Sequence, residues 1–348
     1  PPAGAAARRA SAAAGALLSR VAVMGAGSWG TAFALVLADA GHEVRLWARR
    51  SEVAEAVQRT RRNPDYLPDI ALPAGIRATA DPADALDGAE VVVLAVPSQR
   101  LRESLRGWRL PAGCLVVSLA KGIELGTDLR MSQVVAEVTG IDPDRIGIVT
   151  GPNLAREIAE RQPAAAVVAA TGEDVARRLQ AVCHSPTFRP YTNTDVLGCE
   201  LAGATKNVIA LAVGMGTGLG YGANAVASVI TRGLAETTRL GEALGADPHT
   251  FAGLAGLGDL VATCSSPLSR NRTFGEHLGR GLDVAEATAR SLGVAEGVKS
   301  AESVADLGRR TGVDLPIVEG VRRVVRGEVT PPEAIRDLLA RDPKPERA

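Results

Sequence analysis

The stretch that decides the fold reads Val21-Ala22-Val23-Met24-Gly25-Ala26-Gly27-Ser28-Trp29-Gly30-Thr31-Ala32. A short apolar run leads into glycines spaced Gly25-x-Gly27-x-x-Gly30, and an Ala/Leu-rich segment continues to Gly41. This pattern predicts a strand, a tight turn and a helix. The first glycine allows the turn, the second lets the backbone approach a pyrophosphate, and the third lets the helix pack against the strand. The stretch therefore predicts a dinucleotide site at the helix start; the alternative is a tight turn that binds no ligand.

Length and composition restrict the class of protein. The chain has 348 residues, 46% of them hydrophobic, which is enough for about two domains. Lys+Arg and Asp+Glu both number 39, so the whole-chain charge balance indicates neither a nucleic-acid partner nor a membrane surface. The four cysteines form no CxxC pair and the four histidines show no metal-ligand spacing. We therefore expect a cytoplasmic protein with reduced thiols and no metal.

Both ends of the chain and one apolar stretch differ from the rest. Residues 1–18 are rich in alanine, and we expect a disordered N-terminal extension rather than a secretion signal. Residues 341–348 are expected to form a charged tail. No charged residue occurs from Asn207 to Thr231, but alternating glycines from Gly214 to Gly222 interrupt that stretch. We therefore predict a buried helix followed by a glycine-rich loop, and no membrane insertion.

The segment after Gly41 bears on the choice of cofactor. Residues 42–47 predict the second strand, and many dinucleotide folds place a carboxylate for the ribose hydroxyls at the end of this strand. Here Ala48-Arg49-Arg50 follows, with two guanidinium groups and no carboxylate. This favours a cofactor with a ribose phosphate, although two solvated surface arginines would give the same sequence.

Strands and helices alternate through the rest of the first domain. Apolar segments typical of strands covered on both faces lie at residues 90–97, 114–119 and 146–149, and shorter ones at 165–170 and 187–191. The alternation predicts an α/β fold whose N-terminal part, residues 19–193, is a Rossmann-type, doubly wound and mostly parallel sheet.

Polar residues follow three of these predicted strands. Ser98 follows the first, Lys121 the second, and Thr150-Gly151-Pro152-Asn153 the third. Ligands of open α/β sheets bind at the carboxyl ends of the strands. Lys121 and the residues after Val149 are therefore expected to line one crevice; a surface lysine is the alternative for Lys121.

Strand signals stop near Asp195, and a C-terminal all-α domain is predicted over residues 194–340. Residues 195–213 predict one largely buried helix, and Glu200 and Lys206 are the only charges between Asp195 and Arg232. Burial and neighbouring positive charge lower the pKa of a lysine and suit it to proton transfer. A structural Lys206–Glu200 ion pair is the alternative, and the spacing alone does not decide between them.

Two later segments carry further candidate chemistry. Asp259 is flanked by apolar residues, which indicates a buried carboxylate or a helix cap. Ser269-Arg270-Asn271-Arg272 supplies a hydroxyl, an amide and two guanidinium groups, a set suited to binding a phosphate. The alternative for that cluster is a polar helix start.

Together these segments resemble bacterial NAD(P)-dependent sn-glycerol-3-phosphate dehydrogenases. The matching segments keep the family's order from about residue 20 to residue 340: Gly25–Ala32, Ala95–Ser98, Ala120–Glu124, Gly151-Pro152, Ala204–Val208, Thr231–Glu236, Gly256–Leu260 and Ser269–Arg272. The resemblance implies reversible interconversion of glycerone phosphate (dihydroxyacetone phosphate) and sn-glycerol 3-phosphate, which supplies phospholipid synthesis. It also implies NADP(H) or NAD(H) as cofactor, a small phosphate-ester substrate and a homodimer.

The resemblance assigns roles to individual positions. Lys206 would be the catalytic acid/base, with Lys121 stabilising charge and Asp259 holding the lysines. The cofactor would contact Gly25, Gly27, Ser28, Trp29, Gly30, Arg49, Arg50, Lys121, Ala155, Arg270, Val294 and Glu296. The substrate would contact Lys121, Gly151, Asn153, Lys206, Asp259, Ser269, Arg270 and Asn271. One departure is Asn153, where many relatives have Ser or Thr.

Two rival functions share part of this pattern. A β-hydroxyacid or sugar-nucleotide dehydrogenase also joins a dinucleotide fold to a helical domain with a lysine, but the Ser269–Arg272 cluster favours a small phosphate ester. A non-catalytic NAD(P)H sensor needs the glycine turn but not Lys121, Lys206 and Asp259 together.

Overall fold

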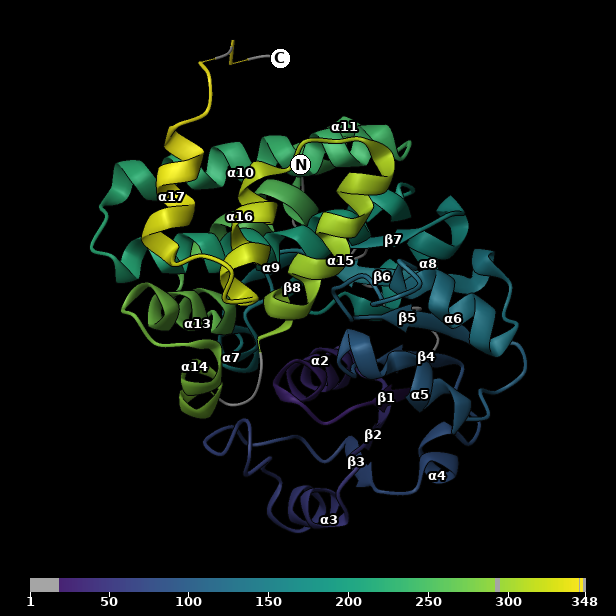
Figure 1. The fold of residues 1–348 in the computed structure, drawn as a ribbon. Helices are drawn as coiled ribbons and strands as arrows, with labels where there is room; N and C mark the ends of the chain where they lie inside the picture. The colour runs from purple at the N-terminus through teal and green to yellow at the C-terminus, as the bar shows by residue number, and fades with distance from the viewer. Residues whose placement is uncertain (1–18, 292–294, 344, 347–348) are drawn as a thin grey trace, which may run out of the picture.

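The computed structural model describes residues 19–291, 295–343 and 345–346. The extension expected at residues 1–18 and the predicted cofactor residue Val294 lie outside the described residues. Figure 1 shows a strand-containing N-terminal part and a helical C-terminal part that packs against one end of it. The last strand ends at Asn193 and the first helix of the helical part begins at Val196.

The N-terminal part is an eight-stranded sheet in the order β3-β2-β1-β4-β5-β6-β7-β8. Every neighbouring pair is parallel except β6 and β7, so the sheet is mostly parallel, as predicted. The strands are β1 (Arg20–Met24), β2 (Glu43–Trp47), β3 (Ile76–Thr79), β4 (Val91–Leu94), β5 (Leu115–Ser118), β6 (Ile146–Thr150), β7 (Ala164–Ala170) and β8 (Phe188–Asn193). The strand order reverses between β1 and β4, which is where ligands of such sheets bind.

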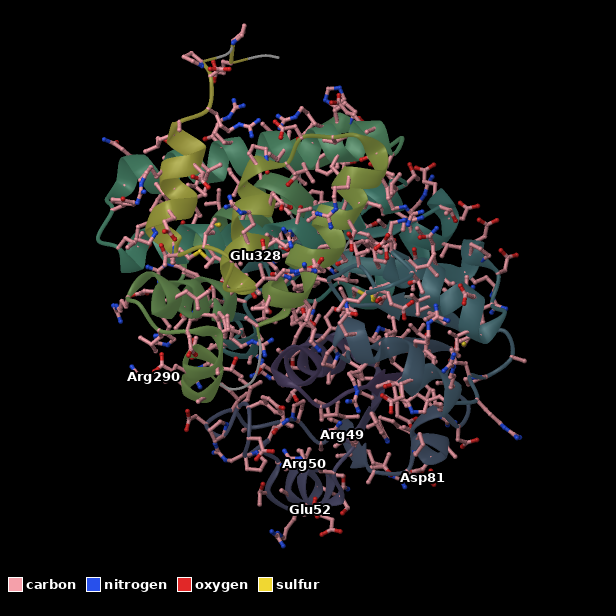
Figure 2. All side chains as sticks on the ribbon, viewed as in Figure 1. Arg49, Arg50, Glu52, Asp81, Arg290 and Glu328 are labelled. Atoms are coloured by element: carbon pink, nitrogen blue, oxygen red, sulfur yellow. The ribbon has the colours of Figure 1, made fainter. Side chains whose placement is uncertain are left out.

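Helices cover both faces of this sheet. They are α2 (Ser28–Asp39), α3 (Ser51–Thr60), α4 (Pro82–Leu86), α5 (Leu101–Arg106), α6 (Met131–Thr139), α7 (Ala155–Ala159) and α8 (Glu173–Cys183), with short 3₁₀ turns η1 (Ser98–Arg100) and η2 (Pro143–Arg145). The β2–β3 edge lies away from the helical part, and Figure 2 shows Arg49, Arg50 and Glu52 at that end.

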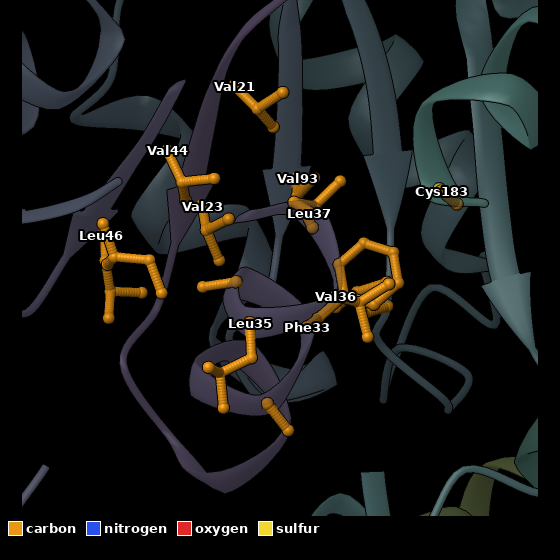
Figure 3. Packing of buried hydrophobic residues seen from close by; sticks show 14 of the residues in the cluster. Val21, Val23, Phe33, Leu35, Val36, Leu37, Val44, Leu46, Val93 and Cys183 are labelled. Atoms are coloured by element: carbon orange, nitrogen blue, oxygen red, sulfur yellow. The ribbon is translucent and has the colours of Figure 1, made fainter. Parts of the chain in front are cut away.

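Strand residues alternate between the two faces, as the period of two requires. Val21 and Val23 of β1 belong to the cluster with Phe33 and Leu37 of α2 (Figure 3), whereas Ala22 and Met24 belong to the cluster on the opposite face. These four side chains of β1 are fully buried, which explains why residues 21–24 form a continuous apolar run.

The described residues of the C-terminal part form helices joined by turns and short loops, with no strand. It contains α9 (Val196–Gly218), α10 (Ala223–Ala243), α11 (Pro248–Ala252), the π-helical turn η3 (Leu254–Gly258), α12 (Asp259–Ser265), α13 (Arg270–Gly279), α14 (Val284–Arg290), α15 (Glu296–Thr311), α16 (Pro316–Val325) and α17 (Pro331–Leu339). Helix α9 packs against α10, α12, α13 and α15 and forms the centre of this part.

The prediction that the alternating glycines end the helix is wrong for three of them. Gly214, Gly216 and Gly218 are helical, and α9 ends only at Gly218. A Cβ on Gly214 would lie 2.0 Å from the carbonyl oxygen of Arg272, and one on Gly218 would lie 2.3 Å from that of Glu276. The backbone of α13 occupies the space that side chains would need, so these glycines serve close helix packing.

Helix α9 is long and apolar enough to cross a membrane by length and composition alone. However, 89% of its most apolar window is buried inside the protein. A core helix of a globular domain passes the same test, and the burial identifies α9 as one.

Candidate active site

Asp259 lies between two lysine side chains from different parts of the chain. Its Oδ2 accepts a hydrogen bond from Nζ of Lys121 at 2.5 Å, and its Oδ1 accepts one from Nζ of Lys206, also at 2.5 Å. Asp259 is 1% exposed, and Lys206 is buried. Asp259 thus places both ammonium groups at one point, where β5, α9 and α12 meet.

Thr263 adds a group that the sequence analysis did not single out. It lies one turn after Asp259 on α12, and its Oγ1 is 2.9 Å from Nζ of Lys206. The four-residue spacing from Asp259 places both side chains on one face of the helix, a signal present in the sequence once that helix is identified.

Burial shifts the protonation of this cluster. It lowers the pKa of Lys206 to about 8, an effect that the attraction of Asp259 opposes and the positive charge of Lys121 reinforces. Burial alone would raise the pKa of Asp259, but the two ammonium groups hold it below its ordinary value. The cluster therefore contains an ionised carboxylate and a lysine that changes protonation state near neutral pH.

Glu200 does not pair with Lys206, so that alternative is wrong. Its carboxylate accepts hydrogen bonds from Nη1 of Arg130 at 2.6 Å, from the backbone N–H of Ser132 at 2.8 Å, and from Oγ of Ser132 at 2.6 Å. These contacts join α9 to the start of α6. Glu200 thereby connects the helix that carries Lys206 to the N-terminal part.

Residues after β6 border the same cluster. Nζ of Lys121 donates to the carbonyl oxygen of Gly151 at 3.2 Å. Within the described residues, Oγ1 of Thr150 and both polar side-chain atoms of Asn153 are buried without a hydrogen-bond partner. Unpaired buried polar groups are rare because they have lost their hydrogen bonds to water. Thr150 and Asn153 therefore offer hydrogen-bonding groups that a ligand could complete.

The predicted phosphate cluster lies at the start of α13. Ser269 is the N-cap, and its Oγ accepts from the backbone N–H of Arg272 at 3.3 Å, which leaves the hydroxyl proton free to donate. Asn271 donates to Oδ1 of Asn207 and accepts from the backbone N–H of Gly297, both at 2.9 Å. Arg270 is exposed. The cluster is therefore a polar helix start. It is also linked to the lysine site, because Asn271 is hydrogen-bonded to Asn207, the residue that follows Lys206.

The glycine turn has the predicted strand–turn–helix form. Gly25 has φ +135°, and a Cβ on Gly30 would lie 1.9 Å from the carbonyl oxygen of Gly25. A Cβ on Gly27 would meet no atom within 4 Å, so the middle glycine borders open space. Ser28 begins α2, and Nε1 of Trp29 is buried without a partner among the described residues.

Two sequence comparisons cover most of the chain. Residues 20–176 match a family profile described as the N-terminus of NAD-dependent glycerol-3-phosphate dehydrogenase, and residues 195–336 match the profile described as its C-terminus. The chain belongs to this family of dehydrogenases.

Individual relatives agree with that assignment. A glycerol-3-phosphate dehydrogenase [NAD(P)+] from Streptomyces avermitilis is 62% identical over 94% of this chain and 98% of its own length. A relative with the same name from Thermobifida fusca is 60% identical over 95% of this chain and 99% of its own length. The crystal structure of the Coxiella burnetii glycerol-3-phosphate dehydrogenase superposes with a TM-score of 0.88 at 37% identity, covering 93% of this chain and 99% of that one.

Two other predicted cofactor residues, Ala155 and Glu296, each begin a helix. Ala155 begins α7, which packs against α2. Oε1 of Glu296, at the start of α15, accepts a hydrogen bond from the backbone N–H of Ser98 at 3.4 Å. Burial raises the pKa of Glu296, while the positive charge of Arg270 opposes the shift. Glu296 thus connects the helical part to the end of β4.

Arg49 and Arg50 are both exposed, after the end of β2. They differ in their partners: Arg50 forms an ion pair with Asp65, whereas Arg49 has no hydrogen bond or ion pair within the described residues.

Among the described residues, no group of three or more His, Cys, Asp and Glu side chains is arranged to hold a metal ion.

Proposed function

We propose that this protein catalyses the NAD(P)-dependent interconversion of glycerone phosphate and sn-glycerol 3-phosphate, and so supplies glycerol 3-phosphate for phospholipid synthesis. The observation that carries the proposal is the Lys121–Asp259–Lys206 cluster next to the polar start of α13. It joins a proton donor to groups suited to a phosphate ester. Relatives that share 62% of their residues with this chain carry the name of this activity.

The glycine turn fits a nicotinamide dinucleotide. A Cβ on Gly27 would meet open space, which leaves room for a pyrophosphate, and Nε1 of Trp29, two residues later, is buried without a hydrogen-bond partner among the described residues. The pyrophosphate would contact the start of α2, and Glu296 and Ala155 would line the remainder of the site. When bound, the nicotinamide supplies or accepts the hydride.

Lys206 is the proposed acid/base. In the reductive direction its ammonium group donates a proton from Nζ to the substrate oxygen, and in the oxidative direction the neutral amine removes that proton. Lys121 stabilises negative charge on the same oxygen, an effect typically of about 3–4 kcal/mol for one well-placed donor. Asp259 orients both lysines and keeps them from repelling one another.

The substrate phosphate is proposed to bind at the start of α13. Ser269 donates its free hydroxyl proton, and Arg270 supplies a guanidinium group. Asn271 holds α13 to α9 and α15 and has a second N–H for the ligand. Asn153 and Gly151 would contact the substrate from the opposite side, where both polar atoms of the Asn153 side chain are unpaired.

Activity as a hydroxyacid dehydrogenase is the main rival function, because proteins of the same fold include enzymes named for other substrates. A ketopantoate reductase from Ralstonia eutropha superposes with a TM-score of 0.59 at 19% identity, which shows a shared fold only. Steady-state reduction of glycerone phosphate, 2-ketopantoate and 3-oxoacids with NADH and with NADPH separates the two functions. We expect turnover of glycerone phosphate alone; turnover of an oxoacid without it contradicts the proposal.

We further propose a cytoplasmic homodimer that accepts both cofactors and favours NADPH. All four cysteines are free thiols, as expected in a reducing compartment. The unpaired Arg49 favours a cofactor with a ribose phosphate.

A cavity of about 1250 Å³ opens on the helical part between α9, α10, α16 and α17, with walls that are mostly apolar. Such a large exposed apolar surface is typical of an interface, here with a second copy of the chain.

A further inference from the structure

A carboxylate from another loop lies beside the residues that follow β2. No acidic residue occupies positions 48–50, but the structure places the Asp65 carboxylate against the Arg50 guanidinium. Arg50 is the N-cap residue of α3, directly after β2. Since the adenosine ribose of a dinucleotide binds at the carboxyl end of this strand, Asp65 lies beside the predicted ribose position.

The position of Asp65 is set by a buried link to the glycine turn. Asn63 is 0% exposed, and its Nδ2 donates to the carbonyl oxygen of Ala26 at 2.9 Å and to Oγ1 of Thr31 at 2.8 Å. Its Oδ1 accepts from the backbone N–H of Asp65 at 3.3 Å. The loop therefore holds Asp65 at a defined place relative to the pyrophosphate turn, and not merely as one charge on a solvated surface.

The loop is fixed on its other side as well. The backbone N–H of Leu67 donates to the carbonyl oxygen of Asn63 at 3.0 Å, and the Leu67 side chain is 2% exposed within the core of the nucleotide-binding part. Asp65 itself is exposed, between these two buried anchors. Its carboxylate can reach a ligand without rearrangement of the loop.

We propose that Asp65 is a specificity-determining residue for the cofactor, an inference that rests on the proposed function. With NAD(H), its carboxylate accepts hydrogen bonds from the ribose hydroxyls. With NADP(H), the 2′-phosphate competes with Asp65 for Arg50 and is repelled by it, while the unpaired Arg49 attracts the phosphate. Asp65 thereby reduces the preference for NADP(H) that the two arginines alone would give.

Replacing Asp65 with asparagine tests this role, since the variant keeps the shape and removes the charge. The dissociation constants of 2′,5′-ADP, ADP, NADPH and NADH are measured by calorimetry, without catalysis. Because an exposed ion pair contributes up to about 1 kcal/mol, we expect D65N to bind 2′,5′-ADP and NADPH about fivefold more tightly. We expect ADP and NADH to bind no more tightly than before.

Asp69 provides the matched control. It lies in the same loop, is exposed, and pairs with Arg156 at 3.2 Å instead of Arg50. The D69N variant should leave the ratio of the two cofactors' dissociation constants unchanged. An equal change for phosphorylated and unphosphorylated ligands in D65N, or the same shift in D69N, would overturn the inference. Failure of the unaltered protein to bind either dinucleotide would contradict the proposed function instead.

Discussion

Asp259 carries one negative charge between two ammonium groups, at a site from which water is largely excluded. The cluster is therefore one positive charge in excess, which is favourable for a phosphate ester and for a developing alkoxide. Burial disfavours the charged form of Lys206 and lowers its pKa to about 8. A lysine with such a pKa donates and accepts protons readily at neutral pH.

The rate of the enzyme should follow the protonation of Lys206. The acid form donates the proton in reduction, so kcat/KM for glycerone phosphate should fall as the pH rises through about 8. The base form accepts it in oxidation, so kcat/KM for sn-glycerol 3-phosphate should rise through the same pH. Profiles in both directions between pH 6 and about 10 measure this. The role would be contradicted if kcat/KM changed in the same direction with pH for both substrates, or if neither value changed near pH 8.

The partner of Lys206 could not be predicted from residue spacing alone. Glu200 is the nearest acidic residue on the same helix, six residues before Lys206. At about 100° per residue, this spacing turns the two side chains about 120° apart around the helix axis. The two side chains therefore face different directions. Asp259 is 53 residues further on, and only the packing of α12 against α9 brings it to the lysine. The residue spacing left this contact open; the family resemblance implied that Asp259 holds the lysines, and the structure shows the contact.

At the scale of elements, α9 and α13 approach so closely that glycines on both helices are required. Gly214 and Gly218 of α9 face the backbone of α13, and Gly275 and Gly279 of α13 face the carbonyl oxygens of Leu211 and Met215, each at 2.2 Å from an added Cβ. The start of α13 carries the proposed phosphate site. This packing therefore positions Ser269 and its neighbours relative to Lys206.

Alanine substitutions in α9 test this packing. Gly214→Ala should lower the free energy of unfolding by about 1–3 kcal/mol, because its Cβ overlaps the Arg272 carbonyl. It should also raise KM for glycerone phosphate. Gly216→Ala is the control: its Cβ lies 3.7 Å from the Tyr221 ring, and alanine favours a helix by about 1 kcal/mol. Equal unfolding midpoints for both variants would show that the close approach is unimportant.

Sequence reasoning failed at these glycines for a physical reason. An alternating series of glycines weakens an isolated helix, since glycine loses more conformational entropy than other residues. Here the cost is offset by contacts with α13, whose own glycines lie about 60 residues later in the chain. A helix-breaking pattern and a helix-packing pattern look alike until the partner helix is known. Seven of the eight strands were predicted, and central ones such as β4 and β5 are short apolar runs in which every residue is buried. Strand β3 was missed, because it lies at the edge of the sheet and its residues are only partly buried.

At the scale of the whole molecule, the loop between β5 and α6 joins the two parts. Ile123 is 0% exposed and belongs to the core of the helical part, although it follows a strand of the sheet. Asp128 pairs with Arg310 at 2.7 Å, and Arg130 pairs with Glu200. Lys121 lies near the start of this loop, so the loop positions the Lys121–Asp259–Lys206 cluster and connects the two parts. No sequence pattern predicted that arrangement, since it depends on contacts across both parts.

The apolar cavity of the helical part leads to a prediction about assembly. Sedimentation should give twice the 35.9 kDa mass of one chain. Leu339 lines the cavity and its side chain is 82% exposed, so Leu339→Asp should weaken the dimer without unfolding the subunit. Leu125→Asp, an exposed position outside the cavity, should leave the mass unchanged. A monomer at all concentrations, or a dimer that L339D does not weaken, would contradict this interface.

The most direct test of the proposed mechanism is the turnover of Lys206→Ala with glycerone phosphate. General acid–base catalysis contributes about 10²–10⁴-fold, so kcat should fall by a factor in that range. The dissociation constant of NADPH should be nearly unchanged, because the cofactor is held chiefly at the glycine turn. A kcat close to that of the unaltered enzyme would show that Lys206 does not transfer the proton and would contradict the account.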